Sequence, residues 1–340
     1  SITNDSTPKI TGKAEAGSTI TLFNGEVVLG TATVDSQGNF SITINSELED
    51  GKYLLTADTT DSADNTSSKS SSLTITIDTT APNAPSSLVV SPASITNDTT
   101  PTVSGTAEPN STITIETYSG STIVGTLTLT ADNNGDFSYT QPSTDLIPEG
   151  EYTSKFVATD SAGNTSSESS LSFTIDTTAP STPTSLTQIS DKDDSKPTIS
   201  GKTEPNTKVT LFIDSSTLGT TTANSKGAFS FTPSSAISDG TYSIKASATD
   251  SAGNVSSKSS SLSITIDTTA PDAPTSLASS SNDTSPIIIG KAEANSTVTL
   301  FNGDVVLGTT TVDENGIFSI TLTSELEDGK YSLTANTTDS

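Results

Sequence analysis

The sequence predicts an all-β protein made of tandem β-sandwiches, each with about seven strands. Four short sequence marks recur in the same order, and the prolines of the first mark lie 93, 96 and 89 residues apart. That period fits a whole small domain and is too long for a solenoid repeat of about 20–50 residues. Within each copy, apolar residues alternate with Ser and Thr, as in half-buried strands. Clusters of Gly, Asn, Asp and Pro separate these stretches, which is typical of short strands joined by turns.

The four marks define the expected domains. The first is a polar segment such as Asn-Asp-Ser-Thr-Pro, and the second is Gly-x-x-Glu. The third is a turn that ends in Gly-x-Phe, and the fourth is Gly-x-Tyr followed about eight residues later by Thr-Asp-Ser. Three copies then close with Ile-Asp-Thr-Thr-Ala-Pro. The expected domains are residues 1–80 (repeat 1), 81–178 (repeat 2), 179–269 (repeat 3) and 270–340 (repeat 4).

The expected strands follow from the period-two pattern inside a repeat. Residues 18–23, 40–44 and 73–77 alternate apolar and hydroxyl side chains, and no segment has a sustained helical period. A disordered stalk rich in Ser and Thr is the alternative, but it has no need to preserve the alternation. Repeat 4 stops before a segment like 73–77, so it is expected to be truncated and to lack its last strand. Partly buried corners are expected at Tyr53, Tyr152, Tyr242 and Tyr331.

Composition excludes most catalytic functions. The chain has no Cys and no His, so thiolate catalysis, disulfides, zinc–sulfur sites and the commonest general base are all missing. The formal charge of −26 repels nucleic acid and anionic lipid, and no apolar run approaches the ~18 residues of a membrane span. The negative charge favours cations as partners. Because the sequence opens at Ser1 without a methionine, we expect it to be a fragment of a longer chain.

Acidic residues gather at both ends of the expected linkers, which indicates a metal. If the chain enters each domain at one end and leaves at the other, strand directions bring carboxylates together at every junction. Oxygen-only ligands without His or Cys select Ca²⁺, and irregular carboxylate geometry favours it over Mg²⁺. We therefore expect one or two interdomain Ca²⁺ ions per junction. The alternative is that these residues are ordinary turn formers, which accept backbone hydrogen bonds.

The expected metal ligands are assigned to three junctions. They are Glu15, Asp35, Asp78, Asp98 and Asp160 at the first; Glu108, Asp132, Asp136, Asp176, Asp193, Asp194 and Asp250 at the second; and Glu204, Asp267, Asp283 and Asp339 at the third.

Together, the Asp-Thr-Thr-Ala-Pro linkers, Gly-x-Ala-Glu, Asp-x-x-Gly-x-Phe, Gly-x-Tyr and Asp-Ser-Ala-Gly-Asn motifs resemble the bacterial Ig-like repeats of giant Gram-negative adhesins exported by type I secretion. The resemblance implies an Ig-like fold and a secreted, cell-surface location. It also implies a monomeric, elongated rod stiffened by Ca²⁺, whose full protein binds a host-cell or biofilm surface through other parts. Two departures are Asp64 where other copies have Gly, and Asn224 in place of the turn Asp. The family's metal positions fall on Asp78, Asp160, Asp176, Asp250 and Asp267.

Two functions remain open at this point. The first is a spacer or stalk of a surface adhesin that projects a distal binding region. The second is a binding module, in which one or more repeats recognise a host glycan or protein directly. Residues 13–62 and 291–340 are identical at 39 of 50 positions, which favours the spacer because no copy is marked out as a binding face.

Overall fold

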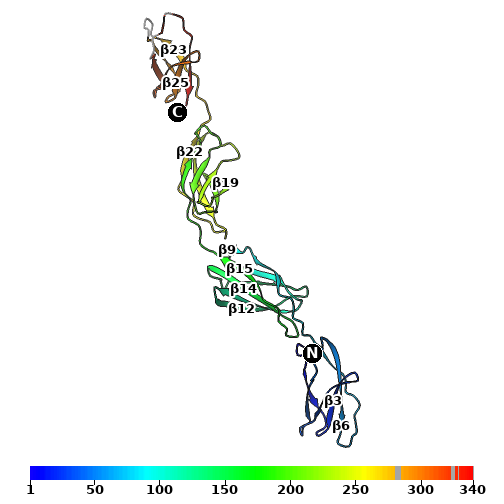
Figure 1. Ribbon diagram of the computed structural model, residues 1–340. Coiled ribbons are helices and arrows are strands. Elements are labelled where there is room, and N and C mark those ends of the chain that lie inside the picture. The colour runs from blue at the N-terminus through cyan, green and yellow to red at the C-terminus, as the bar shows by residue number, and fades with distance from the viewer. Residues whose placement is uncertain (280–284, 323–325, 328, 340) are drawn as a thin grey trace. The chain divides into compact units, whose positions relative to one another are not determined.

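The structure, a computed structural model, describes residues 1–279, 285–322, 326–327 and 329–339. The described residues form strands and no helix, so the predicted all-β fold of tandem sandwiches is confirmed (Figure 1). The chain divides into two compact units, residues 1–180 with 249–255, and residues 181–248 with 256–340. The turn 249–255 of repeat 3 therefore packs with the first unit.

Repeat 1 packs a five-stranded sheet against a two-stranded one. The larger sheet has the order β1-β7-β6-β3-β4, in which β1 runs parallel to β7, and the smaller sheet pairs β2 with β5. The strands are β1 (Ile2–Thr3), β2 (Lys9–Lys13), β3 (Thr19–Asn24), β4 (Val27–Thr33), β5 (Asn39–Thr43), β6 (Gly51–Thr60) and β7 (Leu73–Ile77).

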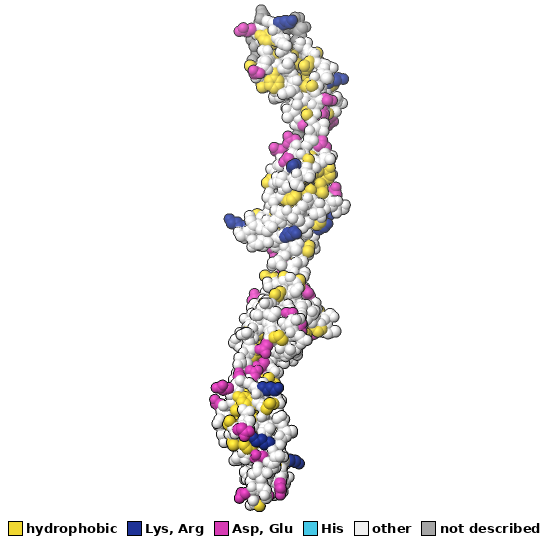
Figure 2. All heavy atoms as spheres, turned by 90° about the vertical axis from the view of Figure 1, so that its right-hand side faces the viewer, with side chains coloured by type: hydrophobic (Ala, Val, Ile, Leu, Met, Phe, Trp, Pro, Cys, Tyr) yellow, Lys and Arg dark blue, Asp and Glu magenta, His cyan; other side chains and the backbone are white. Residues whose placement is uncertain are grey.

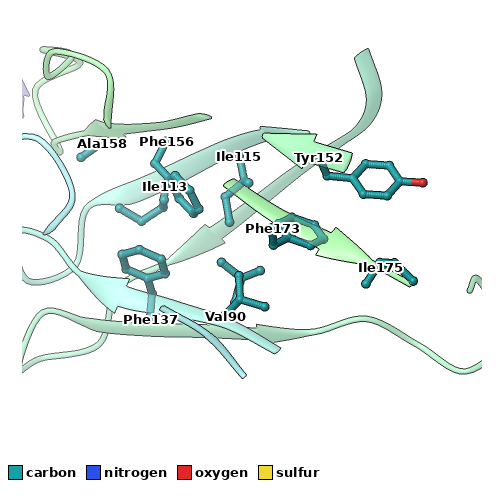
Figure 3. Close-up of a cluster of buried hydrophobic side chains, with 10 residues drawn as sticks. Val90, Ile113, Ile115, Phe137, Tyr152, Phe156, Ala158, Phe173 and Ile175 are labelled. Carbon is teal, nitrogen blue, oxygen red and sulfur yellow. The ribbon is translucent and has the colours of Figure 1, made fainter. Parts of the chain in front are cut away.

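Repeat 2 has the same plan with one more strand. Its sheets have the orders β12-β11-β14-β15-β9 and β13-β10-β8. Figure 3 shows side chains of the two sheets facing each other, with Val90 and Phe137 opposite Phe156 and Phe173. The strands are β8 (Ser86–Ser91), β9 (Ile95–Thr96), β10 (Thr102–Thr106), β11 (Thr112–Ser119), β12 (Thr122–Thr130), β13 (Asp136–Thr140), β14 (Gly150–Thr159) and β15 (Ser169–Ile175).

Repeats 3 and 4 keep the three-stranded sheet of repeat 2, but among the described residues their other sheets have four and three strands instead of five. Repeat 3 has sheets β16-β17-β20 and β19-β18-β21-β22, and repeat 4 has β23-β24-β27 and β26-β25-β28. Each of the four repeats has a hydrophobic cluster of its own. The strands are β16 (Thr184–Gln188), β17 (Ile199–Lys202), β18 (Lys208–Ile213), β19 (Ser216–Thr222), β20 (Ala228–Phe231), β21 (Gly240–Thr249), β22 (Leu262–Ile266), β23 (Thr275–Ser279), β24 (Ile287–Lys291), β25 (Thr297–Asn302), β26 (Val305–Thr311), β27 (Ile317–Thr321) and β28 (Leu333–Thr338).

The Gly-x-x-Glu and Gly-x-Phe marks form one packing unit. In repeat 2, Gly105 on β10 pairs with Phe137 on β13, and a Cβ added to Gly105 would lie 2.7 Å from the Phe137 ring. Since that approach is closer than any side chain tolerates, only glycine fits beneath the ring. The same pairing joins Gly12 to Phe40, Gly201 to Phe229, and Gly290 to Phe318.

The Gly-x-Tyr mark forms a tyrosine corner of the kind found in Ig-type sandwiches. The Tyr152 hydroxyl donates to the carbonyl of Pro148 at 2.9 Å, and Tyr152 itself is buried. The other three tyrosines donate in the same way to the carbonyl four residues upstream. Tyr53 and Tyr242 are half-buried, as expected, whereas Tyr331 is 37% exposed.

One strand in each of repeats 2, 3 and 4 was not expected from the sequence. β8, β16 and β23 follow the Asp-Thr-Thr-Ala-Pro linkers and pair with the Gly-x-x-Glu strands β10, β17 and β24. Each begins with Ser/Thr-Ser-Leu, and the central serine takes a positive φ of 52° at Ser87, 56° at Ser185 and 57° at Ser276. The chain therefore crosses the repeat once before it reaches the polar segment of the first mark.

Candidate functional site: the junctions between repeats

The turn acids are tied to their own turns. Oδ1 of Asp160 accepts hydrogen bonds from the backbone amides of Ala162, Gly163 and Asn164, and Oδ2 accepts one from the Asn164 side chain at 2.8 Å. Burial acts to raise the pKa of Asp160, but the hydrogen bonds from Asn164 and the two amides outweigh it, so the pKa lies below its ordinary value. The structure thus shows the turn-forming role that the sequence left open as the alternative to metal binding.

A second acid in each of the first three repeats holds the linker, and the sequence interpretation missed it. Oε2 of Glu149, directly before Gly-x-Tyr, accepts hydrogen bonds from the amide and hydroxyl of Thr177 and the hydroxyl of Thr178. These hydrogen bonds hold the pKa of Glu149 below its ordinary value, and the bond from the Thr177 hydroxyl has the largest effect. This arrangement, the linker clamp, accounts for the two threonines of Asp-Thr-Thr-Ala-Pro. The equivalent clamp acids are Asp50, which binds Thr79 and Thr80, and Asp239, which binds Thr268 and Thr269.

Repeats 1 and 2 are joined by direct hydrogen bonds. The side-chain amide of Asn164, in the Asp-Ser-Ala-Gly-Asn turn of repeat 2, donates to the carbonyl of Asp78 in the linker at 2.8 Å. In the other direction, the backbone amide of Asn4 in repeat 1 donates to the carbonyl of Ala162 at 3.2 Å. Asp160 holds Asn164 in place for this contact, so the turn acid acts on the junction through its neighbour.

The same joint recurs between repeat 2 and the turn 249–255, which belongs to the same compact unit. Asn254 donates to the carbonyl of Asp176 at 2.7 Å, and the Asn97 amide donates to the carbonyl of Ala252 at 3.0 Å. Ala252 and Asn254 are only 7% and 8% exposed, whereas the equivalent Ala63 and Asn65 of repeat 1 are exposed. Docking of a preceding repeat therefore buries this turn.

In the second unit, acids from three segments line one open pocket. The amide of Asp267 donates to the carbonyl of Lys192 at 3.1 Å, which brings the polar segment of repeat 3 beside its linker. Asp193, Asp267 and Asp339 all line this pocket. A polar segment, a linker and a Thr-Asp-Ser turn thus come together here as well.

The predicted grouping of acids is wrong in several places, because it omitted strands β8, β16 and β23. These strands carry the polar segment to the end of the repeat at which the chain leaves, where β9 pairs parallel with β15. Asp98 accordingly lies beside Asp176 at the second junction rather than at the first. Asp193 and Asp194 follow β16 and lie near Asp267 at the third junction rather than at the second. Asp283 lies outside the described residues.

The Gly-x-x-Glu and Gly-x-Phe acids lie at the opposite end of each repeat from the predicted one. In repeat 1, β6 runs from Gly51, paired with Ile77, to Thr60, paired with Thr19, so Asp78 and Thr19 lie at opposite ends. Glu15 and Asp35 lie at the Thr19 end. By the same registers, Glu108, Asp132 and Asp136 lie at the Asp160 end of repeat 2, the first junction rather than the second. Glu204 accepts a hydrogen bond from the amide of Ser181, at the start of repeat 3 and away from Asp267.

The side chains as arranged do not form a calcium cage. Within the described residues, no three acidic side chains lie close enough together to hold a metal ion. The carboxylates nearest the joints are already engaged, since Asp160 binds its own turn and Asp98 accepts hydrogen bonds from Thr100. The joint seen in the structure is therefore held by direct protein contacts.

Backbone atoms and uncharged polar side chains, drawn in white, cover most of the face in Figure 2, and its apolar areas are small and separate. An open pocket in repeat 2 lies beside the stacked rings of Tyr152 and Phe173, but both side chains are buried. Across the described ranges, the chain contains no helix suited to crossing a membrane.

The bacterial Ig-like domain pattern matches residues 1–79, 89–177 and 186–268, and a related bacterial Ig domain pattern matches residues 270–340. No curated protein matches the chain.

Three solved structures of bacterial adhesins are similar to the chain. A tetra-tandem repeat from the extending region of a large adhesion protein is 26% identical over 98% of this chain and 91% of that one, with a TM-score of 0.31. A Ca²⁺-stabilized adhesin with which an Antarctic bacterium binds ice is 24% identical over 99% and 95%, with a TM-score of 0.36. A structure concerning cell-surface retention of a 1.5-MDa bacterial ice-binding adhesin is 20% identical over 74% and 96%, with a TM-score of 0.29. On the family match, the chain belongs to the bacterial Ig-like domain family, whose domains are structural modules rather than enzymes.

Proposed function

We propose that the chain is a spacer segment of a secreted bacterial surface adhesin, with the four repeats as its domains. Its task is to hold a distal binding region, carried elsewhere in the full protein, away from the cell toward a host-cell or biofilm surface. The repeated joint supports this role: the same two hydrogen bonds connect consecutive repeats at both junctions of the first unit. Because consecutive repeats are connected by the same contacts, the spacing between them is expected to be constant.

Small-angle X-ray scattering of the whole chain tests the spacer. Four sandwiches of about 35–40 Å each, from strands of about eight residues at 3.3 Å plus loops, give an expected maximum dimension of roughly 150 Å for a monomer. A much smaller or concentration-dependent dimension would contradict the proposal. In parallel, a screen against glycans and host proteins tests the binding-module alternative, for which a single strong ligand would be decisive.

We also propose that calcium strengthens the joints, with the linker acids Asp78, Asp176 and Asp267 and the turn acids Asp160 and Asp250 as its ligands. Support comes from the charge of −26 and from the position of these acids beside the joints. Because they do not form a cage as described, binding requires their side chains to turn toward one ion. An ion that binds only the folded state adds about 2.7 kcal/mol to the free energy of unfolding when its free concentration is 100 times its dissociation constant.

Calorimetry with calcium and with a chelator tests this second proposal. Calcium should raise the melting temperature of the unchanged chain, and Asp78→Asn with Asp176→Asn should remove most of that rise. Asp304→Asn, at an exposed hairpin tip in repeat 4, is the matched control and should leave the rise intact. A melting temperature that is the same with calcium and chelator would exclude calcium while leaving the spacer proposal standing.

A further inference from the structure

One sheet of repeat 4 has isoleucines on its outer face. This sheet, β23-β24-β27, has the same three strands as β8-β10-β13 in repeat 2 and β16-β17-β20 in repeat 3. Ile287 and Ile289 on β24 are 41% and 48% exposed, and Ile317 on β27 is 48% exposed. Their neighbours Ile288 and Phe318 are buried, so the three exposed side chains point away from the core.

Strand pairing gathers these three isoleucines into one patch, the isoleucine face. Ile289 pairs with Ser319 and Lys291 pairs with Ile317, so Ile289 and Ile317 are diagonal neighbours on the same side of the sheet. Ile287 lies two residues before Ile289 on β24 and therefore on that side as well. Side chains in these positions are close enough to form one apolar surface.

The isoleucine face distinguishes repeat 4 from the other copies. Alignment of the Gly-x-x-Glu and Gly-x-Phe marks places Lys9, Thr11 and Asn39 of repeat 1, all exposed, at the positions of Ile287, Ile289 and Ile317. The other equivalents are polar or small: Thr102, Ser104 and Asp136 in repeat 2, and Thr198, Ser200 and Ala228 in repeat 3. The isoleucines thus replace polar residues in a copy that otherwise matches repeat 1 closely.

Charges on and beside the isoleucine face suit a contact between two copies. Among the outward-facing residues of β24 and β27, the only charged one is Lys291. The turn before β27 carries Glu314, where repeat 1 has Ser36, and the pairing of Lys291 with Ile317 places this turn at the Lys291 end of the sheet. Asp313 in the same turn accepts backbone hydrogen bonds of the turn itself. Each copy therefore has a positive and a negative group at one end of the face.

We propose that the isoleucine face is a contact between two copies of this chain, related by a two-fold axis that runs along the strands. The isoleucines of the two copies pack against each other, as the inner faces of stacked sheets do, and Lys291 of each copy lies near Glu314 of the other. A chain of charge −26 repels a second copy over most of its surface, so a contact needs a face without acids. In repeat 1 the same arrangement would bring Lys9 of one copy against Lys9 of the other, which is unfavourable.

The small size of the isoleucine face makes the contact weak. A standard interface buries about 1,200–2,000 Å² in total, from about 20–30 residues on each side. Three partly exposed isoleucines supply only a small part of that area. The chain therefore stays monomeric in dilute solution, as the spacer proposal requires, and the contact forms only at high local concentration. This step rests on the proposed function, under which copies of the chain are displayed together on one cell surface.

Disulfide trapping tests the contact in the whole chain, which has no cysteine of its own. Ser319→Cys places a thiol on the isoleucine face beside Ile289, and Ser41→Cys places one at the equivalent position of repeat 1. Each chain is oxidised by dissolved oxygen at a concentration on the order of 1 mM, comparable to the effective concentration of linked molecules. Non-reducing gel electrophoresis measures the rate of dimer formation. Each rate is divided by the rate at which the same thiol reacts with a small aromatic disulfide, to correct for thiol reactivity.

The Ser319→Cys chain should form the dimer at least tenfold faster than the Ser41→Cys chain. Ile287→Lys, Ile289→Thr and Ile317→Asn together should remove this difference, and they should leave repeat 4 folded because repeat 1 folds with these residues. The reverse exchange in repeat 1, with Lys9→Ile, Thr11→Ile and Asn39→Ile, should speed the dimerisation of the Ser41→Cys chain.

Equal corrected rates for the two single-cysteine chains would overturn the proposal and leave the isoleucine face to a partner of another kind. A fast reaction of the Ser319→Cys chain that persists after the triple exchange would overturn it as well. Scattering by the unchanged chain in dilute solution is a separate measurement, so either this proposal or the spacer proposal can fail while the other stands.

Discussion

At the residue scale, the tyrosine hydroxyl is the simplest contact to remove. Tyr152→Phe deletes the hydrogen bond to the Pro148 carbonyl and leaves the ring packed. We expect repeat 2 to lose about 1 kcal/mol of unfolding free energy, the usual net value of such a bond. Denaturant unfolding measures the loss, and Tyr139→Phe in the same repeat is the control. A change of equal size in both variants would contradict the corner's role.

The glycine beneath the phenylalanine ring is the second prediction at this scale. Gly105→Ala forces a methyl group to within 2.7 Å of both Phe137 and Leu88, so we expect a destabilisation of about 1–3 kcal/mol. Gly125→Ala is the control, because nothing lies within 4 Å of the added Cβ. Urea unfolding followed by far-UV circular dichroism compares the two. If Gly105→Ala is as stable as Gly125→Ala, the packing argument fails.

At the scale of elements, the linker clamp makes a prediction about pH. Because hydrogen bonds lower the pKa of Glu149 in the folded state, its stabilising effect is present above the ordinary glutamate pKa of about 4.3. That stabilising effect is lost as the pH falls through the lower pKa that Glu149 has in the folded state. Glu149→Gln should therefore lower the melting temperature at pH 7, and this deficit should become smaller as the pH falls below the ordinary glutamate pKa.

Thermal melting of the unchanged chain and of Glu149→Gln, between pH 3 and pH 7, measures how much the clamp contributes to stability. Glu151→Gln is the control, since Glu151 is exposed on the same strand, β14, two residues away. A deficit in Glu149→Gln that is the same at pH 3 and pH 7 would show that the carboxylate charge has no part in holding the linker.

The elements also show what the sequence reveals and what it hides. The alternation in residues 18–23 and 73–77 predicted β3 and β7 because one face of each is buried. β8 was missed because Pro85, Ser86 and Ser87 are residues typical of loops, and the adjacent apolar residues Val89 and Val90 break the period-two pattern. A signal was present, since Ser/Thr-Ser-Leu follows a proline in all three linkers.

At the scale of the whole molecule, one missed strand changed the grouping of the acids. The sequence identified Asp78 and Asp160 as junction residues. The end of a repeat at which an acid lies, however, depends on how many strands precede that acid in the repeat. Because β8 precedes it, Asp98 lies at the second junction, beside Asp176, and not at the first. The clamp acids were missed for another reason: their partners lie about 29 residues away, and only the folded chain brings them together.

The spacer account depends on direct docking of one repeat onto the next, and a distance measurement tests it. Because the chain has no cysteine, Ser36→Cys in repeat 1 and Ser143→Cys in repeat 2 allow one spin label to be placed in each. Pulsed electron paramagnetic resonance then reports the distribution of distances between them. We predict a single narrow distribution that broadens when Asn164→Ala removes the bond to the Asp78 carbonyl. A distribution that is equally broad with and without Asn164 would contradict the account.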